Sequence, residues 1–108
     1  MTIEKTYEFK RSETKLVEKI VNDENVHINH IILENGQSMP EHYSNSNVYL
    51  IVVKGEMRLK LEDQEPQDYP QGKIINVPYN TKMLIKNESS PLMEFFVLKS
   101  PNPASFEK

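Results

Sequence analysis

Three glycines, Gly36, Gly55 and Gly72, are spread along the chain, and each lies between two stretches that have the composition of β-strands. Glycine reaches the positive φ angles of tight turns at low steric cost, whereas β-branched and aromatic residues favour strands. Because the chain has so few glycines, their placement constrains the fold more than any other feature. It predicts several short strands joined by tight turns, which is typical of an all-β sandwich or barrel.

Strand predictions cover most of the chain. Residues 57–62 alternate apolar and charged side chains, as a half-buried strand does, whereas residues 48–53 are apolar on both faces, as expected of a strand covered on both sides. Residues 14–21 also have helical spacing, but the segment is short and lacks a strong cap, so 16–21 is interpreted as a strand. Residues 63–72 are expected to form a polar loop. The predicted strands are 16–21, 26–33, 48–53, 57–62, 74–77, 82–86 and 92–98.

Length and composition limit the possible functions. The chain of 108 residues is assigned to one domain, 1–108, with a barrel at about 24–100, N-terminal strands in 1–23 and a short tail at 101–108. The absence of cysteine excludes disulfides, thiolate metal sites and a cysteine nucleophile. The net charge of −3, with both signs interspersed, argues against nucleic-acid binding. No apolar run is long enough for a signal peptide or a membrane span, so we expect a cytoplasmic protein with no membrane partner.

Residues around the glycines recur at fixed spacings. In the first group, five residues separate Gly36 from His42, and Gly55 closes the group. In the second, five residues separate Gly72 from Pro78, and the group ends at Asn87. These spacings resemble the two motifs of the cupin superfamily, G-x5-H-x-H-x3,4-E-x6-G and G-x5-P-x-G-x2-H-x3-N. All three glycines of the chain coincide with motif glycines.

This resemblance implies a double-stranded β-helix, or jelly-roll barrel, in which two packed antiparallel sheets enclose a space with an open mouth. Cupins often dimerise through a sheet face or by exchanging an N-terminal strand, so a homodimer is expected. Tyr49, Ile51 and Val53 would form an apolar outer face that another strand or a second subunit must cover.

The resemblance places the family's metal ligands at positions where this sequence has mostly other residues. His42 matches the first histidine, but Ser44 replaces the second, Val48 replaces the glutamate and Met83 replaces the last histidine. Asn80 likewise replaces a motif glycine. A single imidazole does not hold a divalent ion well, so no metal site and no cofactor are predicted. A metal site rebuilt from other residues, such as His30, His42 and Glu94, remains an alternative.

The first functional hypothesis is a metal-free barrel that binds a small, partly apolar molecule. The replaced ligands make the usual metal site largely apolar, and such a pocket needs few polar groups to orient its ligand. His42 and Ser44 would supply hydrogen bonds, although a lone histidine there is equally well explained as a structural group. The predicted ligand-binding residues are His42, Ser44, Val48, Leu50, Met57, Met83 and Ile85.

Two other functions remain open. One is an enzyme: either a metal-independent isomerase or epimerase in which His42 acts as a base, or a metal enzyme in which other residues rebuild the site. Alternatively, it is a structural or interaction protein whose barrel is filled by its own side chains, such as Met57, Met83 and Phe95 or Phe96. Inward methionines more often fill a core than line a binding site.

Overall fold

The structure, a computed structural model that describes residues 3–106, consists of short antiparallel strands and one short terminal helix. The elements are β1 (Leu16–Asn22), β2 (His27–Glu34), β3 (His42–Tyr43), β4 (Val48–Lys54), β5 (Glu56–Leu61), β6 (Gln67–Pro70), β7 (Ile74–Val77), β8 (Lys82–Lys86), β9 (Leu92–Lys99) and α1 (Pro103–Phe106). No helix in the described part of the chain is long and apolar enough to span a membrane.

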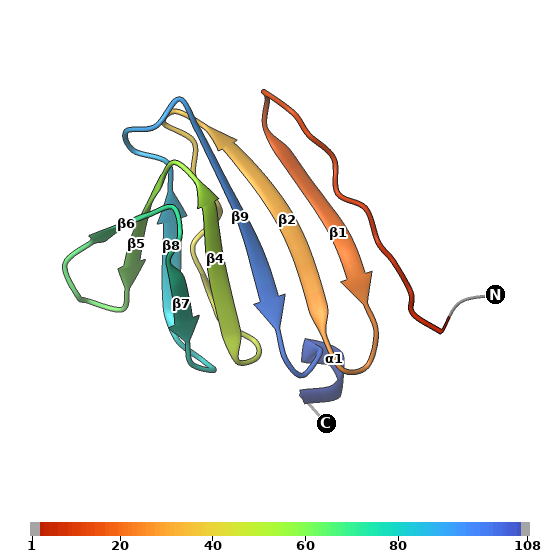
Figure 1. The fold of residues 1–108 in the computed structure, drawn as a ribbon. Coiled ribbons are helices and arrows are strands. Elements are labelled where there is room, and N and C mark those ends of the chain that lie inside the picture. The colour runs from red at the N-terminus through yellow and green to blue at the C-terminus, as the bar shows by residue number, and fades with distance from the viewer. Residues whose placement is uncertain (1–2, 107–108) are drawn as a thin grey trace.

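The strands form two sheets that face each other (Figure 1). The larger sheet has the order β1-β2-β9-β4-β7, and the smaller has the order β3-β8-β5-β6. Every pairing is antiparallel, and strands far apart in sequence become neighbours, as where β9 pairs with both β2 and β4. The predicted all-β, double-stranded β-helix fold is therefore confirmed.

The core lies between the inner faces of the two sheets, where side chains alternate as the sequence predicted. In β4, Val48, Leu50 and Val52 are buried, whereas Tyr49 is 36% exposed and Val53 is 42% exposed on the outer face. The expectation that 48–53 is covered on both sides is therefore wrong. Its apolar outer face is only partly covered, because no other sheet lies over it.

Two predictions about the polar parts of the chain need correction. The expected loop 63–72 contains β6, which pairs with β5, and Arg58 of β5 and Asp68 of β6 form an ion pair (2.9 Å).

The expected N-terminal strands in 1–23 reduce to β1, because no strand occurs between residues 3 and 15. That segment, which we call the N-terminal arm, lies over the outer face of the larger sheet, where the Phe9 ring contacts the Phe96 ring. Residues 1 and 2 lie outside the described residues.

The turn residues adopt the conformations that their spacing predicted. Gly36, Gly55 and Gly72 all have positive φ. At Gly55 a side chain is also excluded by space, because a Cβ atom would lie 2.5 Å from the carbonyl oxygen of Leu92. Asn80, which replaces a motif glycine, keeps the left-handed conformation with φ of 60°. Asparagine tolerates this region better than most residues, so the loop retains its shape without glycine.

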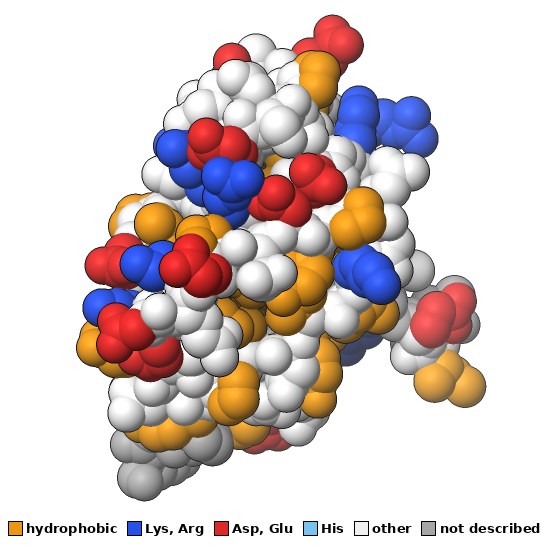
Figure 2. Space-filling model, turned by 90° about the vertical axis from the view of Figure 1, so that its left-hand side faces the viewer, with side chains coloured by type: hydrophobic (Ala, Val, Ile, Leu, Met, Phe, Trp, Pro, Cys, Tyr) orange, Lys and Arg blue, Asp and Glu red, His pale blue; other side chains and the backbone are white. Residues whose placement is uncertain are grey.

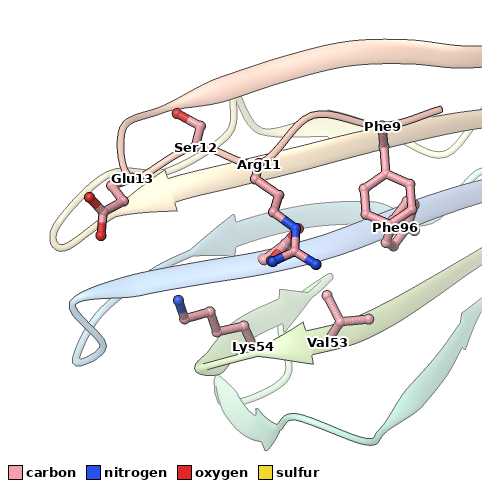
Figure 3. Close-up of a pocket in the computed structure, with 8 residues that line it drawn as sticks. Phe9, Arg11, Ser12, Glu13, Val53, Lys54 and Phe96 are labelled. Atoms are coloured by element: carbon pink, nitrogen blue, oxygen red, sulfur yellow. The ribbon is translucent and has the colours of Figure 1, made fainter.

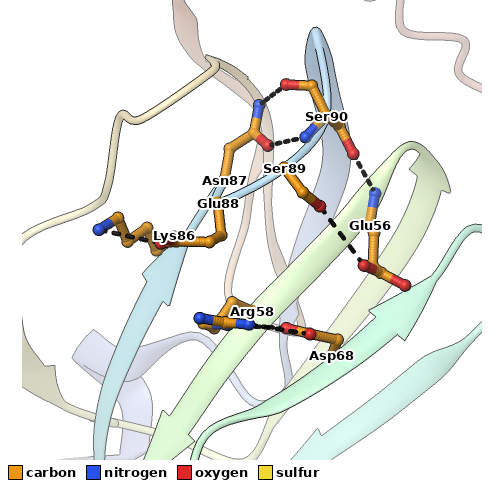
Figure 4. A network of polar contacts seen from close by, with 8 residues as sticks. All are labelled: Glu56, Arg58, Asp68, Lys86, Asn87, Glu88, Ser89 and Ser90. Atoms are coloured by element: carbon orange, nitrogen blue, oxygen red, sulfur yellow. Dashed lines mark hydrogen bonds and ion pairs between the residues drawn. The ribbon is translucent and has the colours of Figure 1, made fainter.

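Two further features shape the edges of the fold. The motif residue Asn87 is fully buried, and its side-chain amide donates to the carbonyl oxygen of Leu33. The same amide group bonds to the backbone of Ser90, which ties the turn between β8 and β9 (Figure 4). The pairing of β1 with β2 shifts register between Lys19 and Val21, which marks a β-bulge in this edge strand.

Seen from the side of β5 and β6, the surface carries acidic and basic side chains interspersed with hydrophobic ones (Figure 2).

Candidate ligand-binding site

A cavity of about 130 Å³ lies between the two sheets. Most of its wall is apolar, and it receives residues from β2, β4 and β9 of the larger sheet and from β3 and β8 of the smaller sheet. The cavity is lined by Asn29, Ile31, Met39, His42, Leu50, Met83, Ile85, Val97 and Lys99. The rest of the interior is closely packed, with Met57, Met93 and Phe95 fully buried.

His42 and Met83 are direct partners across the β3–β8 pair, so two motif positions meet at the wall of this cavity. The Nδ1 atom of His42 lies 3.0 Å from the carbonyl oxygen of Pro40. A carbonyl oxygen only accepts, so Nδ1 donates and the other ring nitrogen, Nε2, is an acceptor in the neutral ring. His42 can therefore orient a ligand that donates a hydrogen bond.

Asn29 and Lys99 add polar groups to the wall. The Oδ1 atom of Asn29 is buried without a hydrogen-bond partner. Such an acceptor is costly to leave unpaired, so a bound donor would be favoured there. Burial lowers the pKa of Lys99, because it penalises the charged ammonium group. His27 lies directly opposite Lys99 in the strand pairing. Burial, followed by the charges of Lys99 and Lys19, lowers the pKa of His27.

Of the predicted ligand-binding residues, the structure brings His42, Leu50, Met83 and Ile85 together at this cavity. Ser44, Val48 and Met57 do not line it. The Ser44 hydroxyl donates to the carbonyl of Pro78 (2.5 Å) and accepts from the backbone of Thr81 (2.8 Å), so it stabilises a loop. Val48 and Met57 are fully buried in the packed core.

The predicted ligand-binding residues do not include Asn29, Met39 and Lys99, nor Ile31 and Val97, which also line the cavity. For Asn29 and Lys99, the alternation of inward and outward residues along a strand could have indicated that the side chain points inward. Asn29 alternates with His30 on β2, and Lys99 continues the inward series of Phe95 and Val97 on β9. Met39 precedes β3 and is held by its backbone N–H, which donates to the carbonyl of Ile85, a contact that no local pattern indicates.

The family's metal does not fit the residues at the motif positions. His42 offers one imidazole, the Ser44 hydroxyl is occupied by backbone partners, and Val48 has no donor atom. A divalent ion needs three or four good donors in a fixed geometry. Among residues 3–106, no group of three His, Asp or Glu side chains is arranged to hold a metal ion.

The alternative site of His30, His42 and Glu94 is not assembled either. His30 and Glu94 do meet, with Nε2 and Oε2 2.5 Å apart, but they lie on the outer face of the larger sheet. His42 lines the cavity on the inner side. The second ring nitrogen of His30 is bonded to Glu18 (2.8 Å), so neither nitrogen is left for a metal.

A second, more open hollow of about 690 Å³ lies on the outer face, between the N-terminal arm and strands β4 and β9. Figure 3 shows the ring of Phe9 from the arm against that of Phe96, with the Arg11 side chain extending toward β9. Both charge signs are present, and the lining residues are Phe9, Arg11, Ser12, Glu13, Val53, Lys54, Glu94 and Phe96. This mixed lining does not single out one ligand chemistry.

Comparison with known proteins agrees with the fold and the motif spacing. The family model described as "Cupin" matches residues 5–107. The chain therefore belongs to the cupin family.

Several relatives extend this result. The chain is 62% identical over 102 residues to an uncharacterized protein of Methanocaldococcus jannaschii, covering 94% of this chain and 88% of that protein. It is also similar to the crystal structure of an RmlC-like cupin family protein with a double-stranded β-helix fold from the same organism, with a TM-score of 0.96, 58% identity and full coverage of both chains. A cupin superfamily protein from Desulfitobacterium hafniense shares the fold, with a TM-score of 0.73 and 16% identity over 85% of this chain and 82% of that one.

Proposed function

We propose that this cupin binds a small, partly apolar molecule in the cavity between its sheets, without a metal ion. The observation that carries the proposal is the 130 Å³ cavity itself, which interrupts an otherwise packed interior. Its apolar wall would hold a hydrocarbon group, while His42 and Asn29 would orient a polar group. A mostly apolar lining with few polar atoms is the usual composition of small-molecule sites.

The size of the cavity limits the ligand. An apolar cavity of about 150 Å³ in another protein accommodates benzene. The present cavity of 130 Å³ is slightly smaller, so its ligand buries about six non-hydrogen atoms. A barrel wholly filled by its own side chains agrees less well, because the cavity leaves part of the interior open beside the packed core around Met57 and Phe95.

Catalysis by His42 finds less support. A histidine base is usually oriented by a carboxylate or held against a substrate proton. The Nδ1 atom of His42 bonds to a backbone carbonyl, and no acidic side chain lines the cavity.

The methionines allow a direct test of binding. Met39 and Met83 line the cavity, whereas Met57 and Met93 are fully buried elsewhere in the core. In a titration with 3-methylbutan-1-ol, followed by NMR of ¹³C-labelled methionine methyl groups, the signals of Met39 and Met83 should shift saturably. Those of Met57 and Met93 should stay nearly constant and serve as an internal control.

A matched pair of variants locates the binding. Ile85→Phe fills the cavity and should abolish the shifts, whereas Leu84→Phe, next to it on the opposite face of β8, should preserve them. Unmoved signals of Met39 and Met83 in the wild type, or equal shifts in both variants, would contradict binding in this cavity.

A further experiment addresses the metal. Protein purified without chelators should contain less than about a tenth of an equivalent of Fe, Mn, Ni, Zn or Cu, because the donor set is too small. His42→Ala should leave that content unchanged. Near-stoichiometric metal that disappears in His42→Ala would overturn the metal-independent proposal.

A further inference from the structure

The cavity is lined by one lysine, Lys99, and by no acidic side chain. Lys99 continues the inward face of β9 after Phe95 and Val97, and its side chain lines the cavity. The lining contains no aspartate or glutamate. None of the ion pairs found within residues 3–106 includes Lys99.

The surroundings of Lys99 add no negative charge. Its direct partners in the strand pairing are His27 on β2 and Val48 on β4. Burial alone accounts for the lowered pKa of Lys99, with no contribution from a neighbouring charge. An ammonium group that is partly removed from water and lacks a counter-ion is unfavourable, and a bound anion would relieve that cost.

His27 and Asn29 have buried polar atoms that are also unsatisfied. The Nε2 atom of His27 and the Oδ1 atom of Asn29 have no hydrogen-bond partner within the described residues. Both residues share the inner face of β2, next to Lys99 on β9. Buried unpaired polar atoms are uncommon in native proteins. The Nε2 atom of His27 can donate to an anion in the tautomer that carries the ring proton there, whereas Oδ1 of Asn29 only accepts and favours a ligand that also has a donor.

We propose that the ligand of this cavity is a small aliphatic carboxylic acid, bound as its carboxylate, with the anion at Lys99 and the hydrocarbon tail between Met39, Met83 and Ile85. This inference rests on the proposed function, which it makes more specific. A carboxylate is compact enough for this cavity, and an ammonium group forms charge-assisted hydrogen bonds with it. A hydroxyl group on the carbon beside the carboxylate would, in addition, donate to the free acceptor of Asn29.

The test compares ligands of equal shape and different charge. Isovalerate, its neutral amide isovaleramide and the cation isopentylamine are titrated separately at pH 7, followed by the methyl signals of Met39 and Met83. Isovalerate should bind at least about tenfold more tightly than isovaleramide, because an ion pair replaces a neutral hydrogen bond. Isopentylamine should bind most weakly, since its charge has the same sign as that of Lys99.

Variants assign the preference to one side chain. Lys99→Met keeps the apolar stem but removes the charge, and should abolish the preference for isovalerate while isovaleramide still binds. Lys99→Gln should behave in the same way and provides a second variant. Lys60→Met, at an exposed position of β5, is the control and should keep the full preference.

The outcomes separate the two proposals. Equal affinities for isovalerate and isovaleramide, or a preference that survives Lys99→Met, would overturn the carboxylate inference and leave binding in the cavity intact. If neither isovalerate, isovaleramide nor 3-methylbutan-1-ol moves the methyl signals of Met39 and Met83, the proposed function itself fails.

Discussion

At the scale of single residues, His30 is a polar group held by contacts on several sides. It is fully buried, its ring stacks on that of Phe96 with centroids 4.7 Å apart, and its two nitrogens contact Glu18 and Glu94. His30 thus joins β1, β2 and β9 across the outer face of the larger sheet, which is a structural role rather than a ligand-binding one.

Glu18 makes the stability of this cluster dependent on pH. The backbone N–H of Lys10, and then the His30 ring, hold the pKa of Glu18 below its usual value of 4.5. A carboxyl group with a lowered pKa stabilises the fold above its unfolded-state pKa, and this contribution is lost as the pH falls through the folded-state value. The contribution of Glu18 is therefore present at neutral pH, begins to fall as the pH drops below about 4.5, and is lost once the pH has passed the lower folded-state pKa.

Glu18→Gln should accordingly lower the free energy of unfolding at pH 7 by about 1–2 kcal/mol, because a charge-assisted hydrogen bond is weakened. The difference from the wild type should shrink as the pH falls below 4.5. Urea unfolding at several pH values between 7 and 3 measures both effects, and Glu24→Gln, in the exposed turn after β1, is the control. Parallel pH curves for the wild type and Glu18→Gln would contradict this account.

Lys99 gives a second prediction at this scale. Its pKa is lowered by burial, so the unfolded chain binds the proton more readily and the charged side chain opposes folding at neutral pH. This cost disappears as the pH rises above the usual lysine value. Lys99→Met should therefore raise the free energy of unfolding of the ligand-free protein at pH 7, by about 1 kcal/mol. Denaturant unfolding at pH 7 measures it, and a destabilised variant would mean that Lys99 has a favourable partner.

At the scale of elements, strands with a clear apolar pattern were predictable and those held by long-range contacts were not. The alternation in β5 and the β-branched run of β2 mark both strands in the sequence, and 16–21 is confirmed as β1. β6 was missed because its residues are polar, and its strand conformation depends on pairing with β5. For the candidate cavity, the motif spacing identifies the lining residues His42 and Met83. It does not identify Lys99, which lies outside both motifs in the sequence.

The turns at Gly55 and Gly72 offer a matched comparison. Both residues have positive φ, but only at Gly55 would a Cβ atom collide with the backbone, 2.5 Å from the Leu92 oxygen. Gly72→Ala should cost about 1–2 kcal/mol of stability, the penalty of a left-handed conformation for a side chain. Gly55→Ala should cost clearly more than Gly72→Ala in urea unfolding. Equal losses would show that the chain near Leu92 moves aside easily.

At the scale of the whole molecule, the apolar outer face of the larger sheet leads us to expect a partner subunit. The outer face of the larger sheet exposes Tyr49, Val53 and Ile74, the last by 65%, beside the N-terminal arm. An apolar face of this kind on a small domain is a typical interaction surface. We therefore expect a homodimer in which two copies of this face meet.

Light scattering after size-exclusion chromatography should give twice the chain mass of 12.6 kDa. Val53→Glu should reduce the mass to that of one chain, because a charge at the interface would be desolvated. Val17→Glu, also exposed but on β1, should leave the dimer intact. A wild-type protein that is monomeric at high concentration would refute the expected interface.

The bulge in β1 has a consequence for how copies of this chain meet at high concentration. β1 ends the larger sheet, so its free side exposes backbone groups that could recruit a strand from another molecule. The register shift between Lys19 and Val21 interrupts the regular spacing of those groups. A straight strand from a neighbour is therefore poorly matched to the whole length of β1, and we expect this edge to resist strand addition from another molecule.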